Sequence, residues 1–288
     1  MATAYQPVTE DLQRWILAQV AAGCRPDDVL AAMLSSGWDA AVAVAALEKT
    51  LLDHEAAKEA PLQALLPAPT AALPGLALQG GAASVRAGGR DVDVLTTLKL
   101  PTIVVFGQLL SADECTALMA LAAPRLARSE TVDNATGGTE VHAARTSEGM
   151  FFTRGEAPLI ERIEQRIAEL LHWPVDHGEG LQILRYQPGA EYKPHHDYFD
   201  PVHPGTERIL QRGGQRLASL VIYLNTPDGG GATTFPDVGL EVWPVRGNAV
   251  FFSYDRPHPS TRTLHGGAPV TAGEKWVATK WLRQGVFT

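Results

Sequence analysis

Apolar residues recur every three or four positions in the first fifth of the chain, which is the spacing of one face of an α-helix. The first such face consists of Leu12, Trp15, Ile16 and Val20. Pro26, followed by two acidic residues, is suited to open a second helix, and Asp39 is suited to cap the N-terminus of a third. The pattern therefore predicts a small bundle of short helices over residues 1–58.

Prolines and paired glycines mark the stretch that follows, residues 59–97. Four prolines fall between residues 61 and 74, and glycine pairs follow at Gly80-Gly81 and Gly88-Gly89. Proline interrupts regular structure, and glycine adds conformational freedom. This composition predicts a linker over residues 59–97 and a second domain over residues 98–288.

Short apolar strands and two helices are predicted in that second domain. Residues 101–106 form a β-branched run, and Ser111 with Glu114 makes a capping box that starts a helix. Residues 160–171 carry isoleucine and leucine at helical spacing, and from Gly180 onwards short apolar runs alternate with glycine and proline. Many short strands after helices predict an α+β fold whose core is a double-stranded β-helix, or jelly roll, with helices packed on one sheet.

Composition and charge narrow the classes of partner. Hydrophobic residues make up 45% of the 288 residues and charged residues 19%, an ordinary globular balance. The net charge of −8 at pH 7 argues against nucleic acid and against an anionic membrane as partners. No apolar run is long enough to span a bilayer, and no signal peptide is visible at the N-terminus. The two cysteines, Cys24 and Cys115, are therefore expected as free thiols in a cytoplasmic protein.

The candidate chemistry is concentrated around His195 and Asp197. If this stretch is extended, residues two positions apart point to the same side, so that the imidazole and the carboxylate converge while His196 points away. A second imidazole is available far downstream, at His265. Two histidines and one aspartate are the ligand set of non-haem Fe(II) oxygenases, which leaves other metal positions open for substrate chemistry.

Two motifs carry a family resemblance: Y-x-x-H-x-D from Tyr192 to Asp197, and L-H-G-G-x-P-V-x-x-G-E-K-W from Leu264 to Trp276. Together they resemble the prolyl 4-hydroxylase-like Fe(II)/2-oxoglutarate-dependent dioxygenases. In that family a lysine follows the distal histidine by ten residues, as Lys275 follows His265 here. The resemblance covers roughly residues 98–281 and leaves the N-terminal part of the chain unexplained.

The resemblance implies the cosubstrates and the residues that hold them. Fe(II), 2-oxoglutarate and dioxygen are expected, with ascorbate as a stimulant. Three groups of residues are implied: His195, Asp197 and His265 as catalytic metal ligands; Lys275, Tyr186 and Thr233 as 2-oxoglutarate-binding residues; and Arg145, Tyr192 and Trp281 as substrate-facing residues. The lysine is expected to neutralise the second carboxylate of 2-oxoglutarate, because an unpaired charge inside an apolar barrel is costly.

Alternatives remain at several of these positions. His258 is the rival for the distal ligand, although its flanking residues do not match the motif. Tyr186 and Thr233 would also serve simply as strand formers, and Arg145 as one half of a structural ion pair. Residues 198–213 leave the metal motif directly and are polar and rich in turn residues, so they form either a lid over the site or a plain connection.

The resemblance implies an enzyme that hydroxylates an unactivated C–H bond and releases succinate and carbon dioxide. A proline-like ring is the expected target, with a peptide or protein substrate favoured over a free cyclic amino acid because a separate helical domain suits a macromolecular partner. The alternative is a binding module with a vestigial jelly-roll site, in which the bundle is the active part. Residues 33–38 resemble a turn of ubiquitin-associated-like bundles, and a homodimer formed through the bundle is a further reading.

Overall fold

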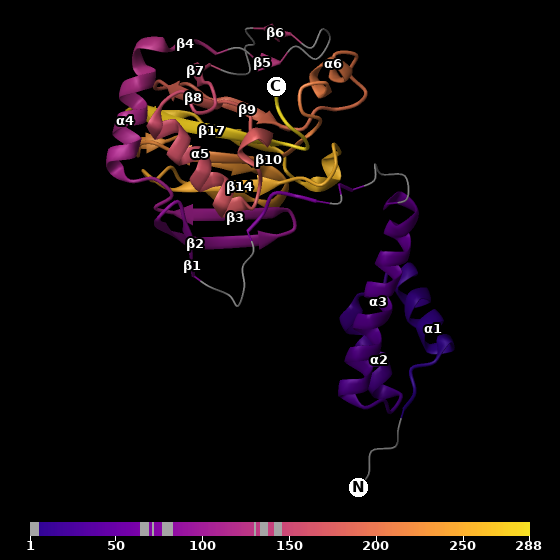
Figure 1. Ribbon diagram of the computed structural model, residues 1–288. Helices are drawn as coiled ribbons and strands as arrows, with labels where there is room; N and C mark the ends of the chain where they lie inside the picture. The colour runs from indigo at the N-terminus through magenta and orange to yellow at the C-terminus, as the bar shows by residue number, and fades with distance from the viewer. Residues whose placement is uncertain are drawn as a thin grey trace. The chain divides into compact units, whose positions relative to one another are not determined.

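The computed structural model describes residues 6–63, 69–70, 72–76, 83–129, 131–132, 138–140 and 146–288. The chain divides into two compact units, Met1–Leu66 and Pro67–Thr288 (Figure 1). Within the described ranges, no helix is long and apolar enough to cross a membrane.

The described part of the first unit is helical, as the apolar spacing predicts. Its helices are α1 (Glu10–Ala21), α2 (Pro26–Ser35) and α3 (Ala40–Gln63). Asp39 caps α3, because its Oδ1 accepts hydrogen bonds from the backbone N–H groups of Ala41 at 2.9 Å and Val42 at 3.3 Å. Ile16 and Met33 lie in the core of this unit, but Trp15, which shares the predicted apolar face, remains 38% exposed.

The second unit is built on a large antiparallel sheet. In the described residues its strand order is β1-β2-β3-β14-β10-β17-β8-β7-β4. The strands are β1 (Ser84–Ala87), β2 (Arg90–Lys99), β3 (Thr102–Gly107), β4 (Ala127–Arg128), β7 (Glu148–Phe152), β8 (Leu181–Tyr186), β10 (Arg216–Tyr223), β14 (Ala249–Ser253) and β17 (Lys275–Arg283). Strands β10 and β17 are almost wholly buried, which is expected for strands covered on both faces.

A smaller sheet with the order β13-β12-β15-β9 makes the second half of the jelly roll. Its strands are β9 (Tyr192–His195), β12 (Thr233–Phe235), β13 (Leu240–Val242) and β15 (His265–Gly267). Two short pairs complete the described strands: β11 (Gly229–Gly230) with β16 (Val270–Ala272), and β5 (Thr131–Val132) with β6 (Thr139–Glu140).

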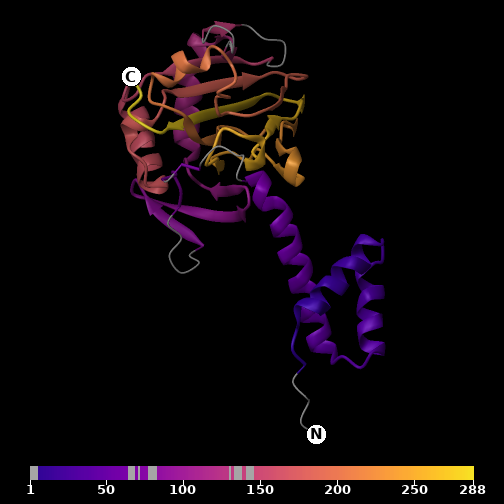
Figure 2. The same cartoon turned by 90° about the vertical axis from the view of Figure 1, so that its right-hand side faces the viewer.

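The core of the second unit has two layers (Figure 2). Helices α4 (Ala112–Ala122) and α5 (Pro158–Leu171) pack on one face of the large sheet, where Leu118 and Ile163 meet Leu220. Tyr223, Phe235 and other aromatic and branched side chains fill the space between the two sheets. The short remaining helices are η1 (Ala123–Arg125), η2 (Val175–His177), α6 (Thr206–Leu210), η3 (Pro236–Val238) and η4 (Pro259–Thr261).

The helix signals in the second domain are confirmed. Ser111 Oγ accepts a hydrogen bond from the Glu114 backbone N–H at 3.1 Å, and the Glu114 carboxylate accepts one from the Ser111 N–H at 2.9 Å, which completes the capping box of α4. Helix α5 buries Ile160, Ile163 and Ile167 on the face that the apolar spacing predicts.

The structure corrects the expected linker over residues 59–97. Helix α3 continues to Gln63, and residues 84–99 form strands β1 and β2 of the large sheet. Gly88 and Gly89 have positive φ angles of 54° and 73° and join the paired residues Ala87 and Arg90. A glycine pair between two paired strands is a hairpin signal, because both turn residues need φ above zero. The same two glycines therefore close a tight turn instead of loosening the chain.

Candidate metal centre

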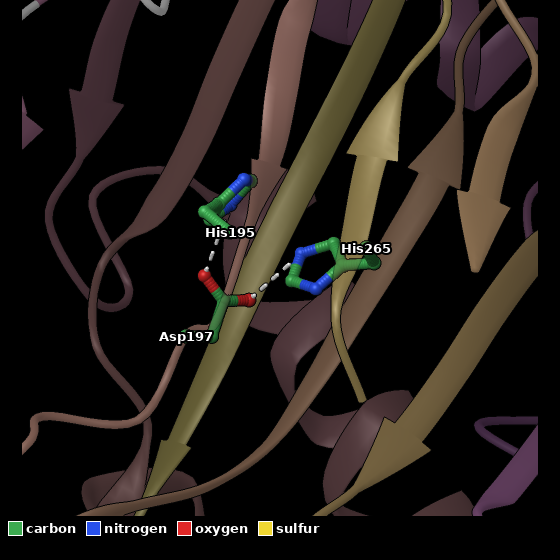
Figure 3. Close-up of side chains that lie close together, drawn as sticks. All are labelled: His195, Asp197 and His265. Carbon is green, nitrogen blue, oxygen red and sulfur yellow. Dashed lines mark ion pairs between the residues drawn. The ribbon is translucent and has the colours of Figure 1, made fainter. Parts of the chain in front are cut away.

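Two neighbouring strands of the smaller sheet bring His195, Asp197 and His265 together (Figure 3). His195 ends β9 and His265 begins β15, and the two residues are partners in the antiparallel register. Asp197 lies two residues beyond His195. Nε2 of His195 is 3.5 Å from Oδ1 of Asp197, and Nε2 of His265 is 3.4 Å from Oδ2. One ligand atom from each residue therefore lies within 4.8 Å of the others.

Backbone carbonyls orient both imidazoles. Nδ1 of His195 lies 2.9 Å from the Lys193 carbonyl oxygen, and Nδ1 of His265 lies 3.0 Å from that of Thr263. A carbonyl oxygen only accepts, so in the neutral form of each ring Nδ1 carries the proton and Nε2 presents a lone pair. Burial lowers the pKa of His265 to about 4, which keeps that ring neutral at pH 7. The histidines therefore offer two lone pairs toward one point.

Ser219 of β10 fixes the orientation of the Asp197 carboxylate. Ser219 Oγ donates to Oδ2 of Asp197 at 2.5 Å and lies 3.1 Å from the Tyr254 hydroxyl. Burial alone would raise the pKa of the Asp197 carboxyl, but the groups that face it, among them the Arg216 guanidinium, hold this pKa well below its usual range. Asp197 therefore presents an ionised carboxylate in a fixed orientation, which suits it to bind a metal ion.

A cation fits this arrangement by its chemistry. Two imidazole lone pairs face an ionised carboxylate at 3.4–3.5 Å without a proton to share, and such contacts repel unless a positive ion lies between them. Two nitrogen donors and one carboxylate oxygen suit Fe(II) and form the facial triad of non-haem oxygenases. His195, Asp197 and His265 thus fit Fe(II), the ion predicted from the sequence.

Beyond the aspartate lies a buried ionic cluster of Glu179, Arg216 and Arg283. The Glu179 carboxylate accepts from Nε of Arg216 at 2.6 Å and from Nε of Arg283 at 2.7 Å. Arg216 also approaches Asp197, with Nη1 4.0 Å from Oδ1. Sequence reasoning missed this cluster, as it missed Ser219 and the Tyr254 hydroxyl behind it.

Lys275 provides a buried cation near the metal ligands. It begins β17, pairs in register with Tyr186 of β8 and is only 4% exposed. Its Nζ lies 5.6 Å from the Tyr186 ring centre and 5.7 Å from that of Tyr223, and no carboxylate of the described residues pairs with it. Burial lowers the pKa of Lys275 to about 8. A buried ammonium without an anion is unfavourable, so this position is suited to a ligand carboxylate.

A narrow cavity of about 50 Å³ connects Lys275 with the metal ligands. Tyr186, Thr233 and all three members of the cluster line it. The Tyr223 hydroxyl donates to Thr233 Oγ1 at 2.8 Å and so orients the threonine beside the cavity. A ligand that chelates a metal at one end and carries a carboxylate at the other, as 2-oxoglutarate does, matches these two features.

A second, larger cavity of about 1220 Å³ opens beside the cluster. Tyr192 stacks on His195 with ring centres 3.8 Å apart, and Trp281 lies against the Arg216 guanidinium at 4.0 Å. Both aromatic residues, which are predicted to face the substrate, line this cavity. Arg145, the third predicted substrate residue, lies outside the described residues.

His196 and the rival ligand His258 do not belong to the cluster. His196 stacks on Tyr198 with ring centres 4.8 Å apart, in agreement with the predicted alternation. His258 caps η4, where its Nδ1 accepts a hydrogen bond from the Ser260 backbone N–H at 3.1 Å. The structure therefore places His265, and not His258, beside Asp197.

The segment of residues 198–213 forms part of the wall of the larger cavity. Tyr198 and Phe199 are buried, and the segment contains the short helix α6. The Gln215 side chain makes two hydrogen bonds to the Phe199 backbone: it accepts one from the N–H at 2.7 Å and donates one to the carbonyl oxygen at 2.8 Å. The segment is thus a structured wall beside the metal ligands.

Comparison with known proteins agrees with the ligand set. Residues 181–283 match the profile of the 2OG-Fe(II) oxygenase superfamily. The chain is 40% identical over 216 residues to prolyl 4-hydroxylase 5 of Arabidopsis thaliana, which covers 68% of this chain and 72% of that protein. It is 43% identical over 201 residues to prolyl 4-hydroxylase 1 of the same plant, which covers 64% of this chain and 69% of that protein.

A solved structure also resembles the chain. The viral collagen prolyl hydroxylase of Paramecium Bursaria Chlorella virus-1, crystallised as a 2OG complex, is 29% identical, with a TM-score of 0.49. That match covers 63% of this chain and 95% of the viral protein.

Proposed function

This chain belongs to the prolyl 4-hydroxylase-like family of Fe(II)- and 2-oxoglutarate-dependent oxygenases, and from that premise we propose that it hydroxylates a prolyl residue of a peptide or protein. The protein is a 2-oxoglutarate-dependent dioxygenase that uses Fe(II). The observation that carries the proposal is the pairing of a complete His-Asp-His cluster with a buried ammonium at Lys275 that has no anionic partner among the described residues. A vestigial binding module, the alternative reading, would have no use for either feature.

In this proposal His195, Asp197 and His265 hold Fe(II). With 2-oxoglutarate and dioxygen, the iron supplies the oxidation that converts a C–H bond into C–OH, while 2-oxoglutarate becomes succinate and carbon dioxide. The protein keeps the three ligand atoms aimed at one point through the carbonyls behind the imidazoles and the Ser219 hydroxyl behind the carboxylate.

Lys275 neutralises the second carboxylate of 2-oxoglutarate in the proposed complex. Tyr186 and Thr233 lie beside the same narrow cavity and offer hydroxyl groups to that carboxylate. Because an ammonium in an apolar site interacts strongly with an anion, this contact fixes the position of 2-oxoglutarate relative to the iron ligands.

The size of the larger cavity favours a peptide over a free cyclic amino acid. Pockets for small molecules are closed clefts of about 300–1,000 Å³, whereas this cavity measures about 1220 Å³. Tyr192 and Trp281 offer flat faces on which a pyrrolidine ring would pack beside the metal ligands. Arg145 completes the proposed substrate residues as a donor to peptide carbonyls.

The first unit is proposed to act as a separate domain; it ends at Leu66, beyond the boundary at residue 58 predicted from the sequence, which falls inside α3. Ile16, Val29, Met33 and Leu47 give it a hydrophobic core of its own. We propose that this bundle serves a macromolecular contact, either with the protein substrate or between two copies of the chain.

The function is tested by mass spectrometry for the gain of one oxygen. Proline-rich peptides, free proline and its six-membered homologue are incubated in parallel with the Fe(II)-loaded enzyme and 2-oxoglutarate, and succinate is measured in the same samples. We expect oxygen gain on a peptide and none in the Asp197→Ala variant. Oxygen gain on the free amino acids alone would replace the peptide proposal, and the absence of succinate after iron loading would remove the enzymatic one.

A further inference from the structure

The wall of the larger cavity is positively charged, although the chain as a whole is acidic. The chain carries 24 Lys and Arg against 32 Asp and Glu. Among the described residues that line the cavity this balance reverses. Seven are basic and three are acidic: Arg128, Arg154, Lys193, Arg208, Arg212, Arg216 and Arg283 against Glu179, Asp197 and Asp200.

The acidic residues of the wall already have partners among the described residues. Glu179 is shared between two arginines, and Asp197 belongs to the metal cluster. Asp200 uses Oδ1 to accept a hydrogen bond from the Val202 backbone N–H at 2.9 Å. The wall therefore holds more positive charge than its own carboxylates neutralise.

Several of the cations have no anionic partner. The side chains of Arg128, Lys193 and Arg208 are exposed and make no ion pair or hydrogen bond with any described residue. Arg154 donates only to the carbonyl oxygens of Asp176 at 2.7 Å and Gly178 at 3.1 Å, so its charge is not neutralised. These side chains are available to a negatively charged ligand in the cavity.

The unpartnered cations come from separate elements around the metal ligands. Arg128 lies on β4, Lys193 on β9 and Arg208 on α6, while Arg154 follows β7. A cleft lined by one sign of charge concentrates its field and attracts ligands of the opposite sign. Four cations from separate elements of one cavity wall suit an extended ligand that bears more than one negative charge.

We propose that the substrate is a peptide in which acidic residues flank the hydroxylated proline. The inference rests on the proposed function and names the class of peptide that the same site prefers. Aspartate and glutamate side chains beside the proline would meet the unpartnered arginines, which suit carboxylates because their planar donors bind both oxygens. Nucleic acid is the less suitable anion, because the net charge of −8 repels a polyanion outside the cleft.

Binding can be measured without turnover. Three labelled peptides of equal length, with aspartate, serine or lysine on both sides of a proline, are titrated with the full chain under anaerobic conditions and followed by fluorescence anisotropy. We expect the aspartate peptide to bind about tenfold more tightly than the serine peptide, and the lysine peptide most weakly. The preference should shrink as salt is raised from low to physiological concentration, because the charges are exposed.

Single substitutions test which arginines cause the preference for the aspartate peptide. Arg208→Gln and Arg128→Gln should each weaken binding of the aspartate peptide by about two- to fivefold and leave the serine peptide unchanged. Arg162→Gln is the control, because Arg162 is an exposed residue of α5 that does not line the cavity. Circular dichroism verifies that each variant is folded.

The outcomes separate this inference from the proposed function. Equal binding of the aspartate and serine peptides, or equal losses in Arg208→Gln and Arg162→Gln, would refute it even if both peptides are hydroxylated. Tight, arginine-dependent binding of the aspartate peptide supports it even if no hydroxylation follows, and only the reaction would then need revision. A single-stranded oligonucleotide is included as competitor, and tighter binding of the oligonucleotide than of the aspartate peptide would overturn the choice of peptide.

Discussion

The hydroxyl of Ser219 donates a hydrogen bond of 2.5 Å to Oδ2 of Asp197, across 22 residues of chain. The serine itself is fully buried on β10, so the contact is shielded from water. It fixes the orientation of the carboxylate, in which Oδ1 faces His195 and Oδ2 faces His265. A hydrogen bond behind a metal ligand of this kind is worth roughly 10- to 100-fold in metal affinity or activity.

Ser219→Ala is therefore expected to weaken metal binding by about tenfold or more, because the carboxylate loses its fixed orientation. Anaerobic titration with Co(II), followed by its visible absorption, measures the affinity. Ser253→Ala is the control, since Ser253 is a buried serine of β14 whose side chain makes no hydrogen bond with the described residues. Equal affinities in the two variants would show that the contact does not position the ligand.

The assignment of the distal ligand predicts a contrast between two histidines. His265→Ala should abolish succinate formation, because one of three metal ligands is lost. His258→Ala should retain most of the activity, because that imidazole caps η4 outside the cluster. Succinate is measured at saturating Fe(II) for both variants. If His258→Ala were as inactive as His265→Ala, the ligand assignment would be wrong.

Lys275→Ala should weaken 2-oxoglutarate binding far more than metal binding. Removing one partner of a buried ion pair costs about 3–5 kcal/mol, which corresponds to roughly two to three orders of magnitude in affinity. Calorimetric titration with Mn(II) in place of Fe(II) gives both constants separately. Parallel losses of metal and 2-oxoglutarate affinity would instead indicate that the lysine supports the fold of the site.

The same lysine predicts how 2-oxoglutarate binding depends on pH. Burial lowers the pKa of Lys275 to about 8 in the free protein. Only the protonated form attracts a carboxylate, so affinity should be constant well below pH 8 and fall by about tenfold per pH unit above it. Lys275→Arg should abolish this dependence, because a guanidinium remains charged throughout this range. Constant wild-type affinity between pH 7 and pH 9.5 would contradict the assigned role.

Local geometry and a motif are enough to predict from the sequence the candidate metal ligands and the candidate cosubstrate lysine. The two-residue spacing of His195 and Asp197 is enough to place both side chains on one side of an extended strand. The partner from β15 and the lysine from β17 were found through the family motif, because spacing within one segment says nothing about a strand far away. The structure supports these positions by the register of His265 with His195 and of Lys275 with Tyr186.

The residues behind the ligands could not be predicted in the same way. Ser219 sits inside an apolar strand, and neither it nor Tyr254 has a local signal that distinguishes it from an ordinary strand residue. Their role depends on which strands become neighbours, and this is fixed only when the sheets form. The prediction that Gly88 and Gly89 belong to a linker was wrong for a different reason. A glycine pair indicates either a hairpin or a flexible stretch until its flanking strands are known to pair.

The buried cluster around Glu179 leads to a prediction about stability. Glu179→Gln leaves the Arg216 and Arg283 guanidinium groups buried without their shared anion, which should lower the free energy of unfolding by about 3–5 kcal/mol. Glu148→Gln is the matched control, because its ion pair with Arg185 is partly exposed and should cost no more than about 1 kcal/mol. Urea denaturation of the metal-free protein measures both. A smaller loss for Glu179→Gln than for Glu148→Gln would mean that the two arginines find other partners, and Asp197, 4.0 Å from Arg216, is the carboxylate within reach.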